Sequence, residues 1–469
     1  MKTINVLMAL TSTALLSVAP LVAQQGGTNG NSTPSGGTHT AVAEPAEKAD
    51  SAPAEAASRS MDPPIVHQHM RPVDQRGINV FEPPKYDTIP YTGFRLGWGA
   101  SFTQQFQDLH HSNKASPKIV DDVNQNQLIG IGGGFNNAVA NLYLNAQMAK
   151  GIRVAVTTYM SSRHHEETWV KDGYLLIDGL PFENAKLDAI MQFVTLKVGH
   201  FEINYGDQHF RRSDNGNTIY NPFVGNLIMD AFTTEIGGEV YLRAGPFMAM
   251  GGLTGGEVHG EVTAPEKRSP SLLGKVGFDD QLTEAVRVRL TGSMYYTRKS
   301  ASNTLYTGDR AGSRYYDVLE NTAASENSQA WSGQIRPGFS SKVRAIVVNP
   351  FVKVRGLELF GNIESARGRG ATETSTRSWN QYAGDVVYRF LPREQLYVAG
   401  RYNTASGRLA GMPNDVSVDR IQIAGGWFLT RGVLAKIEYV RQNYNDFPLT
   451  DIRNGGKFHG VMVEGAVGF

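Results

Sequence analysis

The densest group of side chains that could do chemistry lies in the segment GHFEINYGDQHFRRSDNGNTIYNPF, Gly199 to Phe223. Over eight residues it holds two acids, a histidine and two adjacent arginines: Asp207, His209, Arg211, Arg212 and Asp214. Adjacent arginines present forked donors that suit a phosphate or a carboxylate. If the segment folds into a channel, these side chains lie on an anion path at its constriction. If it is an exposed loop, its acids and arginines pair with one another.

Replacing both arginines by Ser distinguishes these alternatives, because fixed charge matters most where a pore is narrowest and its low-dielectric walls exclude screening ions. For a loop inside the channel we expect the variant to lose anion preference without losing barrel stability. His209 by itself is expected to be a hydrogen-bonded loop residue rather than a metal ligand.

A second polar group stands at His164, His165, Glu166 and Glu167. These are residue types of a metal or acid–base site, but no GxSxG or HExxH pattern accompanies them. The chain has no cysteine, which excludes a disulfide framework, a thiolate metal site and a catalytic thiol. We therefore expect no catalytic residue, no metal and no cofactor. An enzymatic, adhesive or structural role of external loops is the alternative.

The elements that must position these side chains are indicated by alternating apolar and polar residues. The chain ends in KFHGVMVEGAVGF, where Val461, Val463 and Val467 share one face. Such a period of two predicts a β-strand with a different environment on each side. The pattern occurs in sixteen segments: 94–103, 138–147, 152–157, 187–194, 195–204, 233–244, 246–255, 271–279, 285–296, 342–354, 357–366, 378–391, 394–404, 419–430, 433–443 and 457–469.

The connections between these segments alternate in length. Tight turns with Gly, Pro or Asp stand at 150–151, 244–246, 279–281, 355–356, 391–393 and 430–432. Long polar loops occupy 106–136, 164–186, 205–232, 256–270, 297–341, 367–377, 405–418 and 444–456. Turns of this composition join antiparallel strands, and segregated loop lengths are typical of outer-membrane barrels. The sequence predicts an all-β fold, a 16-stranded antiparallel transmembrane β-barrel with short periplasmic turns and long extracellular loops.

Closure of the barrel requires the last strand to pair with the first, since lipid leaves no backbone group unsatisfied. The lipid-facing row of the last strand is then Val461, Val463, Gly465, Val467 and Phe469. Two aromatic girdles are expected, one on the turn side with Phe390, Trp427 and Phe469, and one at the opposite rim with Tyr296 and Tyr402.

A barrel of this strand number encloses water, so its inward-facing residues decide what passes. Thirteen inward positions are basic: Arg95, Arg153, Lys197, Arg243, Lys275, Arg287, Arg289, Lys353, Arg355, Arg389, Arg401, Arg420 and Lys436. Seven are acidic: Glu235, Glu239, Glu358, Glu364, Asp385, Glu438 and Glu464. The surplus of six positive charges favours anions, although some pairs only solvate the wall. Lys353, Arg355 and Arg389 are further candidates for the anion path.

The N-terminal part differs in composition from the rest of the chain. Residues 1–23 read as a signal peptide, and 24–90, rich in Gly, Ala, Ser, Thr and Pro, as a disordered periplasmic linker. The barrel is expected over 91–469. With 45 Lys and Arg against 44 Asp and Glu, nothing indicates a nucleic-acid partner.

The run LKVGHFEINYG, Leu196 to Gly206, resembles a strand-to-loop segment of the phosphate-selective porin family, and the sixteen-strand plan and basic lumen agree with it. In that family the strand leads to a constricting loop, and the resemblance implies a homotrimer. An alternating strand that ends in Phe, here Phe469, resembles the end that the barrel assembly machinery reads. Because the basic residues are scattered over many strands, we expect a bacterial outer-membrane porin, a passive channel for small solutes or anions surrounded by lipid.

Overall fold

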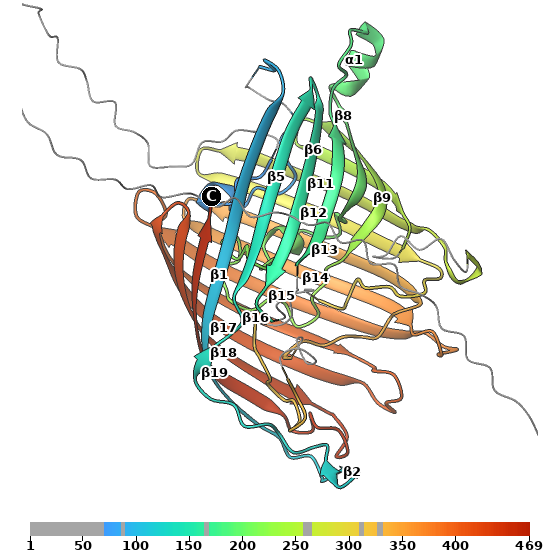
Figure 1. Cartoon of the computed structure of the whole chain (residues 1–469), viewed down its shortest axis with the longest axis vertical. Coiled ribbons are helices and arrows are strands. Elements are labelled where there is room, and N and C mark those ends of the chain that lie inside the picture. Colours follow the sequence, from blue (N-terminus) through green and yellow to red (C-terminus); the bar gives the residue numbers. More distant parts are fainter. Residues whose placement is uncertain (1–69, 86–89, 164–167, 257–264, 309–313, 326–331) are drawn as a thin grey trace, which may run out of the picture. The chain divides into compact units, whose positions relative to one another are not determined.

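The computed structural model describes residues 70–85, 90–163, 168–256, 265–308, 314–325 and 332–469. Over these residues the chain is almost entirely β-structure (Figure 1), with one α-helix, α1 (Ala185–Met191), and three short 3-10 helices, η1 (Gln75–Gly77), η2 (Gln208–Phe210) and η3 (Pro265–Lys267). None of the helices in these ranges is long and apolar enough to cross a membrane.

In the described ranges the wall consists of sixteen antiparallel strands. They are β1 (Arg95–Ser112), β5 (Val139–Ala149), β6 (Ile152–Ser161), β7 (Thr168–Ile177), β8 (Val194–Glu202), β9 (Thr234–Ala244), β10 (Phe247–Thr254), β11 (Ser271–Thr283), β12 (Val286–Thr297), β13 (Lys342–Val354), β14 (Leu357–Arg369), β15 (Arg377–Phe390), β16 (Leu396–Gly407), β17 (Val416–Thr430), β18 (Val433–Asn445) and β19 (Lys457–Gly468). The two-residue strand β4 (Gly134–Phe135) lies on β1, and β2 (Ile119–Val120) pairs with β3 (Val123–Asn124).

The sheet closes between the last strand and the first, as the sequence predicts. β19 pairs with β1 from Ser101↔Gly468 to Ser112↔Lys457, and β1 pairs on its other edge with β5. We call the end of the barrel with the short connections the turn end. There the Trp98 and Phe469 rings are in contact, with centroids 5.9 Å apart. The expected 16-stranded β-barrel is therefore confirmed.

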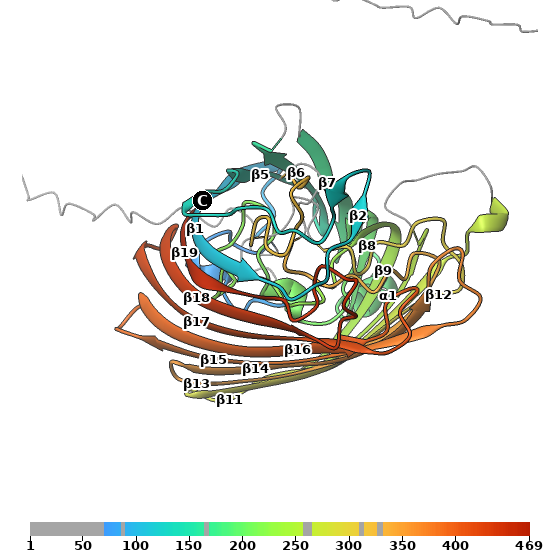
Figure 2. The same cartoon turned by 90° about the horizontal axis from the view of Figure 1, so that it is seen from below.

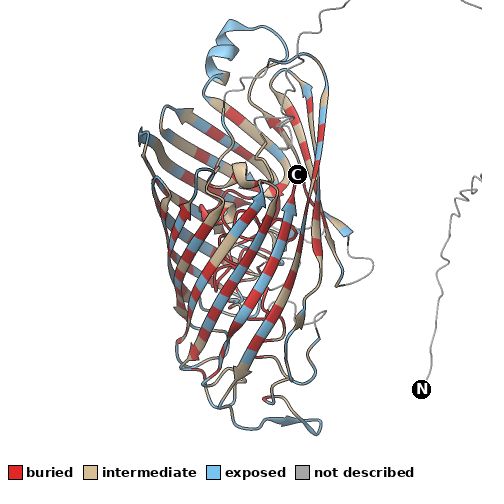
Figure 3. Ribbon diagram, turned by 90° about the vertical axis from the view of Figure 1, so that its left-hand side faces the viewer, coloured by how far each residue is buried: buried red, intermediate tan, exposed pale blue. Residues whose placement is uncertain are grey.

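Alternation along each strand separates an outer face from an inner one, visible as bands in Figure 3. In β19 the row from Val461 to Phe469 is exposed, whereas Met462, Glu464 and Ala466 are buried. Exposed outward side chains are mostly apolar or aromatic, such as Trp427 and Tyr402. The outer face thus has the apolar character that a lipid environment requires.

One strand assignment was wrong. Residues 187–194, expected as a strand, belong largely to helix α1, because Asn184 Oδ1 accepts hydrogen bonds from the amides of Lys186 and Leu187 (3.2 Å each) and caps the helix. The sixteenth strand is instead β7, inside the expected loop 164–186. Its adjacent Lys171 and Asp172, both buried, interrupt the apolar alternation, and pairing with β6 shifts register between Thr157 and Thr158.

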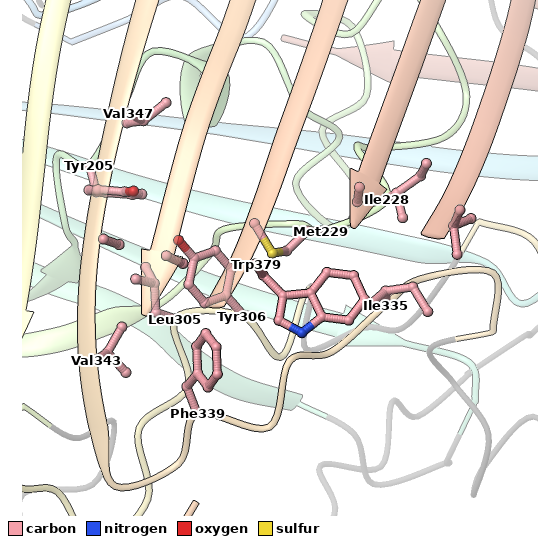
Figure 4. Close-up of a cluster of buried hydrophobic side chains, with 14 of the residues drawn as sticks. Tyr205, Ile228, Met229, Leu305, Tyr306, Ile335, Phe339, Val343, Val347 and Trp379 are labelled. Carbon is pink, nitrogen blue, oxygen red and sulfur yellow. The ribbon is translucent and has the colours of Figure 1, made fainter. Parts of the chain in front are cut away.

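The described parts of two connections between wall strands fill much of the interior, together with residues 70–85, which we call the N-terminal segment. We call residues 203–233, between β8 and β9, the inner loop, and residues 298–341, between β12 and β13, the long loop. Figure 4 shows apolar side chains of both loops packed on the inner face of the wall. They are Tyr205, Ile228 and Met229 of the inner loop, Leu305, Tyr306, Ile335 and Phe339 of the long loop, and Val343, Val347 and Trp379 of the wall.

Candidate functional site: the lumen

The inner loop lies inside the ring of strands, seen end-on in Figure 2. Its backbone is bound by inward-facing side chains of several strands. Glu438 on β18 accepts from Val224 N at 2.8 Å, and Thr103 on β1 donates to Gly216 O at 2.8 Å. Gln381 of β15 accepts from Met229 N at 2.8 Å, and across the ring Glu239 of β9 accepts from Asn204 N at 2.9 Å. Most of the loop is buried, so it narrows the lumen as the first alternative requires.

The two adjacent arginines of this loop are fully buried, each about 1% exposed. Arg212 holds Asp230 with two parallel hydrogen bonds, Nε–Oδ1 at 3.0 Å and Nη2–Oδ2 at 2.7 Å. Arg211 Nη1 lies 3.6 Å from Glu358 Oε2 and also bonds the Asn79 side chain. Burial lowers the pKa of Arg211, although Glu358 opposes this effect. The forked donors of Arg212 are therefore occupied by a carboxylate of the chain itself, whereas Nε and Nη2 of Arg211 have no hydrogen-bond partner among the described residues.

This placement corrects the expected outcome of replacing both arginines by Ser. Such a change leaves the buried Asp230 with the neutral Asn226 amide in place of its cation and removes one of the cations near Glu358, and a buried charge without its counter-ion is costly. The substitution must lower stability, and a change of selectivity cannot be read from it alone.

Asp207 and His209 also make contacts within the lumen. Asp207 accepts from Arg289 Nε and Nη2 (2.8 Å each) and lies 2.8 Å from Lys275 Nζ. His209 Nε2 is 3.0 Å from Asn204 Oδ1, and its Nδ1 is 3.5 Å from Glu202. Burial lowers the pKa of His209, with Glu202 acting in the opposite direction. His209 is thus a hydrogen-bonded loop residue, as expected.

The segment 70–85 was expected to be part of a disordered linker, and this was wrong. Phe81 is 2% exposed and packs on Phe351 and Phe210, with centroids 5.4 and 5.8 Å away. Glu82 pairs with Lys275 at 2.9 Å and Arg289 at 2.7 Å. Asn79 also donates to Glu358 at 2.7 Å, so an aromatic, an acid and an amide side chain of this segment all contact the barrel interior. The other residues assigned to the signal peptide and the linker, 1–69 and 86–89, lie outside the described ranges.

Glu82 and Asp207 therefore share Lys275 and Arg289 in one buried four-residue cluster. Burial raises the pKa of Glu82, but Lys275 and Arg289 lower it by more, and the result lies well below its usual range. For Asp207 the pKa is likewise lowered, with burial opposed by Lys275 and Arg289. Both acids are charged when the segment is docked.

This cluster predicts the pH dependence of docking. A depressed folded-state pKa contributes stability that is complete above the unfolded value, about 4, and is lost as the pH falls through the folded value. We expect the segment to stay docked from pH 8 to about pH 5 and to detach only in stronger acid. A nitroxide on Val80→Cys, in a chain without other cysteines, reports this as a mobile spectrum. Mobility that already increases between pH 7 and pH 5 would contradict the assignment.

The strand candidates Lys353, Arg355 and Arg389 are brought together. With Arg287 they line a cavity of about 390 Å³ at the turn end, between the β11–β12, β13–β14 and β15–β16 turns. Arg355 is exposed, whereas Arg389 is buried and donates to Glu358 at 2.8 Å. Only two acids, Glu284 and Glu394, join the four cations in this lining. We call this cavity the turn-end mouth.

A second cavity, of about 250 Å³, lies between the inner loop, the N-terminal segment and strands β5 to β9. Five lining residues are cationic, namely Arg71, Lys171, Lys197, Arg212 and Arg243. Five are anionic, namely Glu82, Asp172, Asp178, Glu202 and Asp214. Lys171 Nζ joins three of these acids, at 2.7 Å from Glu202, 3.0 Å from Asp214 and 3.6 Å from Asp172. We call this the lumen cavity, and its lining charges balance.

The surplus of positive charge on the wall is compensated to a large extent inside the barrel. Five acids omitted from the inward count pair with wall cations: Glu82, Asp178, Asp207, Asp279 and Glu394. Other wall cations bind acids on neighbouring strands, as Arg401 binds Asp385 at 2.6 Å. Four of these five acids lie outside the strands, in turns, the inner loop or residues 70–85, so the inward-facing register alone could not reveal them; the fifth, Asp279, lies near the end of β11. The group His164 to Glu167 lies outside the described ranges.

No protein-family model and no curated protein sequence matches the chain. Among solved structures it is similar to an anion-selective porin from Comamonas acidovorans, with 11% identity over 80% of this chain and 100% of that chain, and a TM-score of 0.50. It is also similar to a loop-deletion form of OmpT, an outer membrane protein of Vibrio cholerae (8% identity, 80% and 100% coverage, TM-score 0.48). A third is the outer membrane channel DcaP of Acinetobacter baumannii (11%, 81% and 99%, TM-score 0.46).

At such identities the likeness concerns the fold alone. The fold class is a porin-like β-barrel of the kind found in outer-membrane proteins.

Proposed function

We propose that the chain is an outer-membrane porin, a passive, water-filled channel for small solutes. The lumen cavity supports this proposal. It is a space with ten charged residues in its lining, left open beside the inner loop in a barrel whose strand number leaves room for water. The inner loop and the N-terminal segment restrict passage to small molecules.

An anion preference is the finer part of the proposal, and we place its origin at the turn-end mouth. Four cations against two acids line this mouth, whereas charges balance in the lumen cavity. Three of the four pair with acids, and Arg355 is the cation of the mouth that has no ion pair among the described residues. Charge at an entrance raises the local concentration of counter-ions. We therefore expect a weak preference for anions, and no discrimination for phosphate. The likeness to the phosphate-selective family stays a prediction.

Location in a bacterial outer membrane, assembly through the terminal Phe469 and a homotrimeric state belong to the same proposal. The alternative of an enzymatic or adhesive role at the external loops is distinguished from it by whether the folded protein conducts.

Current through the purified barrel in a planar bilayer tests the proposal. In a salt gradient we expect stepwise currents with a small reversal potential of the sign that anions produce. Lys353→Ser combined with Arg355→Ser should move the reversal potential toward zero, because half of the cations at the mouth are removed. Arg408→Ser, an exposed arginine paired with Asp415 in the β16–β17 connection, serves as the control. Folded protein without current would refute the channel, and an unchanged reversal potential would refute the role of the mouth.

A further inference from the structure

Four cations stand together on the outer face of the wall, at the end of β13 and β14 where the long connections lie. The register places Lys342 opposite Arg369 and Arg344 opposite Arg367. The outward direction follows from their neighbours, since Val343, Ala345 and Ala366 point inward with no exposed surface. Arg344 and Arg367 are exposed, and the outer pair is partly buried. We call these four residues the cation grid.

The cation grid joins an apolar surface directly. The next outward residues toward the middle of the barrel are Ile346 on β13, 45% exposed, and Ile363 on β14, 51% exposed, the latter separated from Arg367 by Ser365. The positive charges therefore lie at the border of the apolar outer surface, on the side of the long connections. In a membrane, lipid headgroups lie at this border.

Like charges directly opposite each other on neighbouring strands are destabilising, so two such pairs in succession require an explanation. The carboxylate of the β14–β15 connection interacts electrostatically with Arg369 but forms its ion pair with another cation. Glu373 is held by Arg377 through two hydrogen bonds, 2.6 Å to Nε and 2.7 Å to Nη2. Arg369 Nη1 instead donates to the Glu373 backbone carbonyl at 2.5 Å, and Arg367 Nε to Ser378 Oγ at 3.0 Å. Among the described residues no carboxylate forms an ion pair with the grid.

We propose that the cation grid binds the phosphate group of a membrane lipid with a net negative charge at this end of the barrel. A guanidinium matches phosphate oxygens with two parallel donors, and the lipid chains would then cover Ile346 and Ile363. A bound phosphate places negative charge beside the cations of both cross-strand pairs, and their attraction to it offsets their mutual repulsion. This site is separate from the lumen and does not depend on whether the barrel conducts.

Lipid retention by the purified, detergent-solubilised barrel tests the site. The probes are diphosphoryl lipid A, phosphatidylcholine as a lipid without net charge, and inorganic phosphate, and bound lipid is counted by native mass spectrometry. We expect diphosphoryl lipid A to be retained and phosphatidylcholine to dissociate. The double variant Arg344→Ser, Arg367→Ser should bind the former about tenfold or more weakly, because two cations near the membrane surface are lost.

The matched control is Arg441→Ser, which removes an exposed outward arginine from β18, opposite His459 and Ile421. It should retain lipid A like the unmodified protein. Arg367→Glu gives a second variant that keeps the fold, because it replaces one like-charged pair by a pair of opposite charge, and it should also lose the lipid. Equal retention of lipid A by these variants, or equal retention of phosphatidylcholine, would overturn the proposal. Thermal stabilisation by inorganic phosphate as large as that by lipid A would show a site for a free anion only.

Discussion

Removal of residues 24–85 is expected to raise the single-channel conductance by about twofold or more, because a sixteen-stranded barrel is wide and residues 70–85 occupy part of its lumen. Arg71, Phe81 and Glu82 line the lumen cavity. Gln75 N also donates to Arg431 O at 2.8 Å at the turn end. Deletion opens one side of the cavity and joins it to the space vacated by Phe81.

A shorter deletion, residues 24–69, is the matched control. It keeps every contact that the structure describes for the segment, so the conductance should stay at the full-length value. If removal of 24–85 leaves the conductance unchanged while the barrel stays folded, the segment does not limit passage.

Arg212→Ser is expected to cost about 3–5 kcal/mol of unfolding free energy, the usual loss when one partner of a buried ion pair is removed. The Arg212 side chain has no exposed surface and the Asp230 side chain is 1% exposed. Asn226 Nδ2, 3.1 Å from Asp230 Oδ2, remains as a neutral donor. It cannot replace the charge, so the inner loop, which contributes both residues of the pair, should lose part of its internal structure.

Thermal unfolding in detergent measures the loss, and amide hydrogen exchange over residues 203–233 shows whether it is localised to the inner loop. Arg355→Ser is the control, since this exposed turn residue should change stability by no more than about 0.5 kcal/mol. An Arg212→Ser protein with unchanged stability and a shifted reversal potential would instead put this guanidinium in contact with water on the solute path.

The strands were predictable where the two faces differ strongly. In β19, Val461, Val463 and Val467 face outward while Glu464 faces inward. Alternation alone therefore indicates both the strand and which of its faces points outward. β7 was missed because Lys171 and Asp172 are adjacent and both buried. Lys171 pairs with Glu202 on β8 and with Asp214 in the inner loop. A pattern of neighbouring residues cannot show such partners.

The candidate site was predictable to a smaller extent. The types of residue in the inner loop left open whether it enters the lumen or stays exposed, and only the structure places it inside the ring of strands. The ligands of its charged residues could not be deduced, because Arg211 meets Glu358 and Asp207 meets Arg289, residues from strands more than eighty positions away. Docking of the N-terminal segment could not be predicted for a related reason. Its low-complexity composition predicts disorder, and the stabilising partners of Glu82 lie on β11 and β12.

The central claim, passive passage of small solutes through a narrowed barrel, is tested most directly by the swelling of proteoliposomes in iso-osmotic sugar solutions. Arabinose and raffinose are suitable probes because both are uncharged and differ mainly in size. The account predicts rapid swelling in arabinose and little in raffinose for the full-length protein, with faster swelling in raffinose after removal of residues 24–85. If neither the full-length protein nor the variant without residues 24–85 lets vesicles swell in arabinose, although both are folded in the vesicles, the claim of passive passage is contradicted.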